Sequence, residues 1–140
     1  MENFAVYYTL ALTRTDMRIQ GQIDFTITER TWDLVTAEMP IISGIKNPFG
    51  TVQAGAILWF ADVAATVLAM SSDSPSEGMK GFPLAISLNA NLLSNQKEGV
   101  LLAIASFVKK GKSVSVVRTV VSGTDGKLIA DVTTSHVLSQ

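Results

Sequence analysis

The sequence predicts an α+β fold in which an antiparallel sheet of five or more strands wraps around one long central helix. The helix is predicted at residues 52–70, because alanine, leucine and methionine dominate there and no proline interrupts them. A helix that is apolar on all of its faces must be enclosed on all sides. The flanking segments alternate like half-buried strands and are joined by short turns, which favours antiparallel neighbours.

The strands are predicted from their alternation and from the turn residues that bound them. Before the helix, the polar residues Thr28–Thr31 join two candidate strands, and residues 47–51 have turn chemistry. After the helix, Gly111 and the Gly123–Gly126 segment mark hairpin turns. Residues 4–12 are compatible with either a strand or a helix. The predicted strands are residues 17–28, 31–39, 84–93, 99–109, 113–122 and 128–138.

Length, composition and charge limit the classes of function. The 140 residues are expected to form a single domain, residues 1–140. The chain has no cysteine and only one histidine, so neither a metal site nor a cofactor is expected. Its net charge of −1 gives no electrostatic case for nucleic acid. Its first residues lack the features of a signal peptide, which favours a cytoplasmic location.

Asp62 is the most informative residue of the chain. No other residue between Lys46 and Asp73 is charged. A membrane span is not predicted for this segment, because a central Asp costs about 2.5–3.5 kcal/mol on insertion. A carboxylate in apolar surroundings is rarely left without a partner. Asp62 can therefore either bond a polar group of a neighbouring strand or serve as a catalytic base or nucleophile.

The start of the helix is a second candidate site. If the helix begins near Gln53, its first N–H groups have no partner within the helix, and the helix dipole favours negative charge there. The N–H groups around Ala54 and Gly55 are thus candidate oxyanion donors. Gln53 as a helix cap and Asn47 as a turn residue before proline are equally consistent with purely structural roles.

The distance between these two candidates points to more than one subunit. Asp62 follows Ala54 by eight residues, which places them about 12 Å apart along the helix axis and on adjoining faces. Both cannot touch one atom within a single chain, so a joint site requires a cleft between two subunits. Thr66 lies four residues after Asp62 on the same face, where it can orient the carboxylate or a water.

The segment that contains these residues resembles a known family signature. Asn47-Pro-Phe-Gly-Thr-Val-Gln53-Ala54-Gly55 and Asp62 resemble the motif of hotdog-fold acyl-CoA thioesterases of the phenylacetate-degradation type. That motif reads Asn, two residues, Gly, two residues, His-Gly-Gly, and then Asp or Glu in the helix. Here Gln53-Ala54 stands in place of His-Gly. The resemblance extends over residues 31–138 and includes a turn similar to the family's Gly-Arg-Ser turn.

The resemblance implies a hotdog fold and hydrolysis of a CoA thioester by homodimers, often paired as dimers of dimers. It implies that the Ala54 N–H, with Gln53 and Asn47, polarises the thioester carbonyl. Asp62 of the opposite subunit then attacks as a nucleophile or activates a water, which Thr66 helps to orient. CoA phosphates require cations. The substrate-binding candidates are Gly55 at the helix start and Lys110, Gly111, Lys112 and Ser113 in the basic turn.

Two other classes of function compete with this interpretation. Hydratases of the same fold rely on a His paired with an acid, and no histidine is expected near the helix, because His136 lies far from it in sequence and is expected to be structural. A non-catalytic acyl-CoA-binding or structural protein is suggested by the loss of His-Gly. Trp59, Phe60 and Phe82 are compatible with an acyl tunnel or with core packing. Arg118 is expected to face solvent or pair with a carboxylate.

Overall fold

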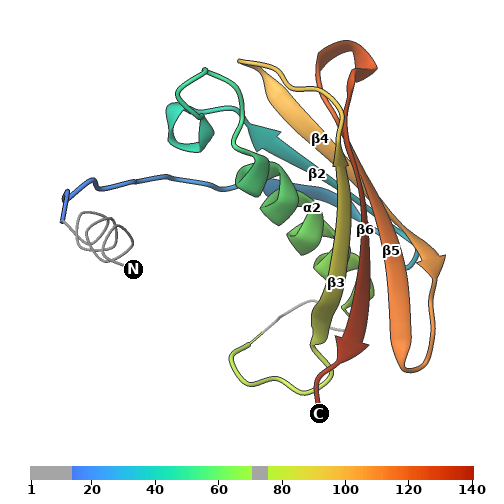
Figure 1. The fold of residues 1–140 in the computed structure, drawn as a ribbon. Coiled ribbons are helices and arrows are strands. Elements are labelled where there is room, and N and C mark those ends of the chain that lie inside the picture. Colours follow the sequence, from blue (N-terminus) through green and yellow to red (C-terminus); the bar gives the residue numbers. More distant parts are fainter. Residues whose placement is uncertain (1–13, 71–75) are drawn as a thin grey trace, which may run out of the picture.

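The computed structural model describes residues 14–70 and 76–140, and the candidate segment 4–12 lies outside them. One long helix and six strands form the described part of the chain (Figure 1). Among the described residues, no helix combines the length and the apolarity needed to cross a membrane. The elements are β1 (Thr26–Arg30), β2 (Leu34–Pro40), the 3-10 turn η1 (Ser43–Ile45), α2 (Ala54–Ala69), β3 (Pro83–Leu92), β4 (Val100–Lys109), β5 (Val114–Ser122), the 3-10 turn η2 (Thr124–Gly126) and β6 (Leu128–Leu138).

The six strands form one sheet in the order β1-β2-β4-β5-β6-β3, and every neighbouring pair is antiparallel. Figure 1 shows the sheet curling around α2, as predicted. The short turns after β4 and β5 do join neighbouring strands, as expected. The expectation is wrong for β3 and β4, which are consecutive in sequence but separated by β5 and β6. Among the described strands, β3 pairs only with β6 and forms an edge of the sheet.

The core lies between α2 and the sheet. The helix packs against β2, β3, β4, β5 and β6. Its face toward the sheet carries Phe60 and Ile57 among several alanines, and the strands also contribute alanine, so the helix can lie close to the sheet. The buried residues include Ala61, Ala64, Ala65 and Leu68 of the helix and Val35, Met39, Leu101, Ala103, Ala105, Val117, Val121 and Val132 of the strands.

Two predicted segments need correction. The strand predicted at residues 17–28 begins only at Thr26, and residues 14–25 have no regular secondary structure. Instead, the Gln22 N–H donates to the Gly44 carbonyl oxygen at 3.1 Å, and the Phe25 ring packs edge-on against Trp59. The residues predicted as a connecting turn, Thr28–Arg30, belong to β1. Within this segment Phe25 packs against Trp59 and Phe60 of the helix, whereas Met17 and Ile19 are exposed.

The strand β3 was expected to be half-buried, but most of it is exposed on both faces. Leu88 and Leu92 are paired with Thr134 and Ala130 of β6, and both of these partners are buried beneath α2. Paired residues of antiparallel strands point to the same face. The two leucines therefore point toward the helix side of the sheet, and yet they are 42% and 48% exposed.

Candidate functional site

Asp62 lies in the middle of α2, as the sequence predicts, and is half-buried. Its oxygen Oδ1 is buried and has no hydrogen-bond partner among the residues that the structure describes. The alternative that Asp62 bonds a serine or an amide of its own protomer is therefore not supported. A buried carboxylate oxygen without a partner is costly, so the arrangement favours a group from outside the residues that the structure describes.

The flank of α2 on which Asp62 lies can be located from the neighbouring strands. Arg30, the last residue of β1, donates to the carbonyl oxygens of Val67 and Met70 at the C-terminal end of α2. Among the strands that pack against α2, β2 lies toward one side of the sheet, and β6 and β3 lie at the other. The charge of Asp62 acts on His136 of β6. Asp62 therefore faces the side of the sheet where β6 and the edge strand β3 lie.

The helix begins at Ala54, with Gln53 as its N-cap residue. Gln53 donates its backbone N–H to the Ile45 carbonyl oxygen at 2.8 Å, and its side chain does not cap the helix. The N–H groups of Ala54 and Gly55 have no partner among the described residues, and both residues are exposed. A Cβ at Gly55 would meet no atom within 4 Å. This helix end can therefore donate hydrogen bonds to a ligand outside the protomer.

The loop that precedes the helix is closed by Asn47. Its Nδ2 donates to Thr51 Oγ1 at 2.9 Å, and its Oδ1 accepts a bond from the Thr51 N–H at 3.2 Å. Gly50 in this loop has a φ of 94°, a conformation that favours glycine. Asn47 therefore shapes the approach to the helix start. Gln53 points its amide toward the Lys46 carbonyl oxygen at 3.5 Å, which is a weak contact.

Thr66 shares the flank of Asp62, as its spacing predicts, and is half-buried. No hydrogen bond joins the two side chains in the described part of the chain. Asp62 and Ala54 of one protomer are about 12 Å apart along the helix axis, as their spacing predicts. The structure thus places the acid and the N–H donors on one helix without bringing them together.

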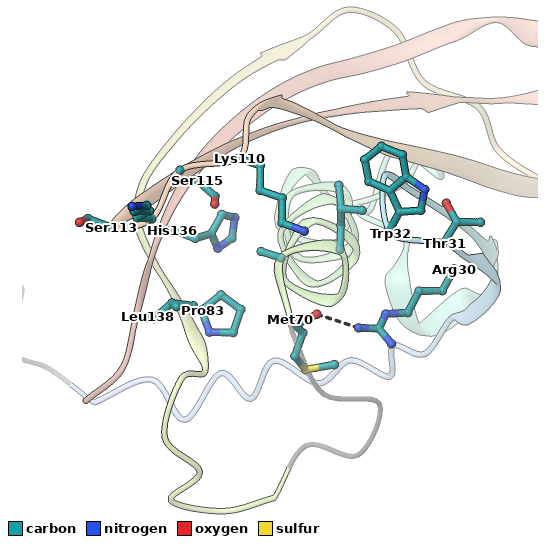
Figure 2. Close-up of a pocket in the computed structure, with 14 residues that line it drawn as sticks. Arg30, Thr31, Trp32, Met70, Pro83, Lys110, Ser113, Ser115, His136 and Leu138 are labelled. Carbon is teal, nitrogen blue, oxygen red and sulfur yellow. Dashed lines mark hydrogen bonds between the residues drawn. The ribbon is translucent and has the colours of Figure 1, made fainter.

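A cavity of about 580 Å³ lies beyond the other end of α2, where the helix meets the β1–β2 turn, the β4–β5 turn and the ends of β3 and β6. Figure 2 shows Lys110 reaching from the β4–β5 turn toward the helix, with Arg30 and Trp32 on the opposite wall. Lys112 and Ser113 also line it. A Cβ at Gly111 would lie 2.1 Å from the Val114 carbonyl oxygen, so only glycine fits this turn. The predicted basic turn therefore forms part of a real cavity.

His136 is nearer to the helix than the sequence suggested. Its ring is buried, lines the same cavity and lies 2.8 Å, through Nε2, from Thr134 Oγ1. Burial lowers the pKa of His136, and the charge of Asp62, which raises that pKa, offsets the effect only in part. The expectation that no histidine lies near the helix is thus wrong. Sequence separation hid this contact, because β6 reaches the helix only through the folding of the sheet.

Two further outcomes concern residues outside the predicted site. Arg118 pairs with Asp131 at 2.7 Å, which confirms the expected pairing with a carboxylate. Asn95, which the sequence did not single out, holds the residue before the helix cap: its Nδ2 donates to the Val52 carbonyl oxygen at 2.9 Å. An asparagine in a polar loop is common, so no sequence signal distinguished it.

Comparisons with known proteins agree with this architecture. The family model of the thioesterase superfamily matches residues 49–130 of this chain. The 1,4-dihydroxy-2-naphthoyl-CoA hydrolase of Listeria monocytogenes is 27% identical over 100 residues, 71% of this chain and 78% of that protein. A variant of a Staphylococcus aureus thioesterase superposes with a TM-score of 0.74 at 25% identity, covering 83% of this chain and 93% of that one. A hypothetical thioesterase protein of Streptococcus pneumoniae, solved with coenzyme A, shares the fold with a TM-score of 0.69 at 14% identity, covering 83% of this chain and 86% of that one.

Proposed function

The chain belongs to the thioesterase superfamily and is a thioester hydrolase, and we propose that it cleaves an acyl-CoA in a cleft between two copies of itself. In this proposal, Asp62 of one copy acts on a thioester carbonyl bound at the helix start of the other. Membership in the phenylacetate-degradation type of this superfamily stays a prediction.

The observation that carries the proposal is the unpaired carboxylate of Asp62. Its Oδ1 is buried, and no group of the described residues bonds it. A bound water supplies the hydrogen-bond donor that the described residues lack, and the free oxygen is open to a substrate carbonyl carbon. A purely structural role would instead require a partner for this oxygen.

The exposed edge of the sheet supports dimerisation through β3. An edge strand presents unpaired N–H and C=O groups that can pair with another chain. Leu88 and Leu92 point to the helix side of β3 and remain about half exposed. A second copy of β3 paired antiparallel would continue the sheet and bring a second helix over these leucines. Such a two-fold contact uses the same patch on both copies.

The two-fold arrangement also assembles the site. Gly55 and Asp62 lie on nearly the same flank of α2, because seven residues make almost two full turns. When two such helices run antiparallel side by side, Asp62 of one copy lies opposite the helix start of the other. The open space at Gly55 supports this approach, because no described residue lies within 4 Å of a Cβ placed there.

The reaction follows from these placements. The thioester oxygen accepts bonds from the N–H groups of Ala54 and Gly55, which stabilise the negative charge that develops on it. Asp62 either attacks the carbonyl carbon or removes a proton from an attacking water. In the first route, a water then hydrolyses the mixed anhydride. In both routes the carbon–sulfur bond breaks and CoA leaves as a thiolate, with the acid released.

Three predicted residues have supporting roles. The Gln53 amide is exposed beside the donors and only weakly bound, so it can turn to donate to the substrate carbonyl. Asn47 acts through the loop that it closes with Thr51, rather than by touching the substrate. Thr66 shares the flank of Asp62 and orients the attacking water.

The cationic cavity is suited to the phosphates of CoA. Lys110, Lys112 and Arg30 place positive charge around its walls, and the Ser113 hydroxyl adds a donor. The cavity begins at Met70, about 12 Å along the axis from Asp62, a distance that the flexible pantetheine arm can bridge. The Streptococcus pneumoniae protein of the same fold was solved with coenzyme A, which agrees with this ligand.

Pairing of two dimers is supported by a patch on the outer face of the sheet. Leu102 and Ile104 of β4 point away from the helix, and are 40% and 47% exposed. Their neighbours across β5 are Ser122 and Val120. An exposed apolar patch of this kind marks an interaction surface.

The test is an assay of released thiol over a panel of acyl-CoA thioesters that includes 1,4-dihydroxy-2-naphthoyl-CoA, the substrate named for the Listeria relative. We expect turnover by the natural protein and a loss of about 10³-fold or more in kcat for Asp62→Asn, with unchanged circular dichroism. Tight binding of acyl-CoA without turnover by the natural protein would refute hydrolysis as its function.

A further inference from the structure

A second cavity, of about 280 Å³, lies beside the start of α2. Ile23 and Ile45 line it together with Ala56 and Trp59 of the helix, so its walls are mainly apolar. Gln53 and Gly55 also line it, which brings the cavity to the N–H groups proposed to bind the thioester oxygen. Trp59 is 40% exposed although its neighbour Phe60 is completely buried.

Contacts on both sides fix the walls of this cavity. The Phe25 ring packs edge-on against Trp59 with 5.1 Å between the ring centres, which holds the indole in place. On the opposite side, the N-terminal segment is tied to η1 by the hydrogen bond from Gln22 to Gly44. A Cβ at Gly44 would lie 2.8 Å from the Gln22 Cβ, so the two backbones approach closely. The cavity is thus built by close packing of the segment before β1.

We infer that this cavity binds the acyl group of the substrate and limits its length, an inference that rests on the proposed function. The carbonyl carbon bears the acyl chain on one side and sulfur on the other. The sulfur side must lead to the cations, which lie at the far end of the helix that carries the acting Asp62. The acyl side then enters the apolar cavity next to the helix start that holds the oxygen.

The volume defines the class of acyl group. A dry apolar cavity of about 150 Å³ in another protein holds one benzene ring. A cavity of 280 Å³ is nearly twice that size. It therefore accommodates one aromatic ring with a short linker, or a linear chain of about eight carbons. Acyl chains much longer than this would have to leave apolar carbons in water.

The experiment compares kcat/KM for acetyl-, octanoyl-, phenylacetyl- and palmitoyl-CoA in three variants. Ile23→Trp fills the cavity from an irregular segment, and should lower the ratio of octanoyl to acetyl turnover by about tenfold. Trp59→Ala opens the cavity and should raise the ratio of palmitoyl to octanoyl turnover. Trp32→Ala removes a tryptophan from the cationic cavity instead, and should raise KM for all four substrates alike.

The outcomes separate this inference from the proposed function. The acyl site is supported if Ile23→Trp or Trp59→Ala changes the ranking of the four substrates by kcat/KM and Trp32→Ala does not. If the natural protein turns over acyl-CoA and neither cavity variant changes the order, the acyl group binds elsewhere and the inference is wrong. If the natural protein turns over none of the thioesters, the proposed function itself fails. Ile23 is partly exposed and outside the strands, so its variant should fold even if Trp59→Ala does not.

Discussion

Asn95 holds Val52 by two hydrogen bonds that mimic the pairing of a strand. Its Nδ2 donates to the Val52 carbonyl oxygen at 2.9 Å, and its Oδ1 accepts from the Val52 N–H at 3.2 Å. Val52 is buried two residues before the helix begins. One side chain from the segment after β3 therefore fixes the position of the first N–H groups of α2, which have no hydrogen-bond partner among the described residues.

Replacing Asn95 should damage both stability and catalysis. Asn95→Ala leaves the polar backbone groups of Val52 unpaired, which costs about 1–3 kcal/mol of unfolding free energy. We expect kcat to fall as well, because the donors at Ala54 lose their fixed position. Asn95→Asp keeps the acceptor and loses the donor. Its unfolding free energy in a urea titration should therefore lie between those of the natural protein and of Asn95→Ala. Equal stability of all three proteins would contradict this role.

His136 should report the charge of Asp62. The chain has one histidine, so its ring gives a single set of proton signals in a titration followed by nuclear magnetic resonance. Burial lowers the pKa of His136 and Asp62 raises it. Asp62→Asn should therefore lower that pKa further. An unchanged pKa in this variant would mean that the two residues are not coupled.

The same histidine should make stability depend on pH. Folding holds the pKa of His136 below its ordinary value of 6.5, so below that pH the unfolded chain binds a proton that the folded chain does not. The unfolding free energy should thus fall as the pH drops from about 7.5 to 5.5. His136→Asn should give a flatter dependence, measured by urea unfolding at fixed protein concentration.

The basic turn should matter only for substrates that carry the nucleotide of CoA. The double variant Lys110→Ala, Lys112→Ala should raise KM for acyl-CoA by about tenfold, more at low salt than at high salt. The N-acetylcysteamine thioester of the same acyl group lacks the phosphates, so the natural protein and the double variant should hydrolyse it equally. Arg18→Ala, which removes an exposed cation of the N-terminal segment, is the control. If the double variant raised KM equally for both substrates, the phosphates of CoA would bind elsewhere.

Charges on the two exposed sheet surfaces should have different effects on assembly. Leu88→Glu places a carboxylate on the edge strand β3 and should give inactive monomers. Leu102→Glu places the same charge on the outer face, where the exposed fraction is similar, and should leave active dimers. Light scattering after gel filtration measures both masses. Active monomers of Leu88→Glu would refute a site shared between copies.

The sequence predicted those elements whose signals are local. The apolar run of α2, the alternation of β4, β5 and β6, and the turn glycines all lie within short windows, so these elements were predicted within a residue or two. The edge position of β3 was missed because strand order depends on contacts between distant segments. Residues 17–25 have the composition of a strand but form none, since Met17 and Ile19 are exposed and Phe25 packs its ring against Trp59 of the helix.

The candidate site was predicted to a similar degree. The isolation of Asp62 and the helix start at Ala54 were visible because charge and proline are absent from the segment around them. The nearness of His136 and the support from Asn95 were not visible, since each depends on a contact across the fold. The apolar cavity at Trp59 was also hidden, because the irregular segment before β1 builds one of its walls.

Two variants remove the two halves of the proposed site separately. Asp62→Asn removes the acid. Ala54→Pro removes one N–H donor at the first helical position, where proline fits because that N–H has no partner in the helix. The preceding residue, Gln53, has a ψ of 135°, which is compatible with a following proline. Ala54→Pro alone should lose about 10²-fold or more in kcat, and Asp62→Asn alone about 10³-fold or more.

Activity of mixed dimers tests the shared site most directly. Subunits of the two variants are unfolded together, refolded and assayed against each variant treated alone. If the acid and the donors come from different copies, each mixed dimer contains one intact site, and random pairing should restore about a quarter of the natural activity. Mixed dimers that form, as shown by different affinity tags, but stay as inactive as the separate variants would contradict a site shared between two copies.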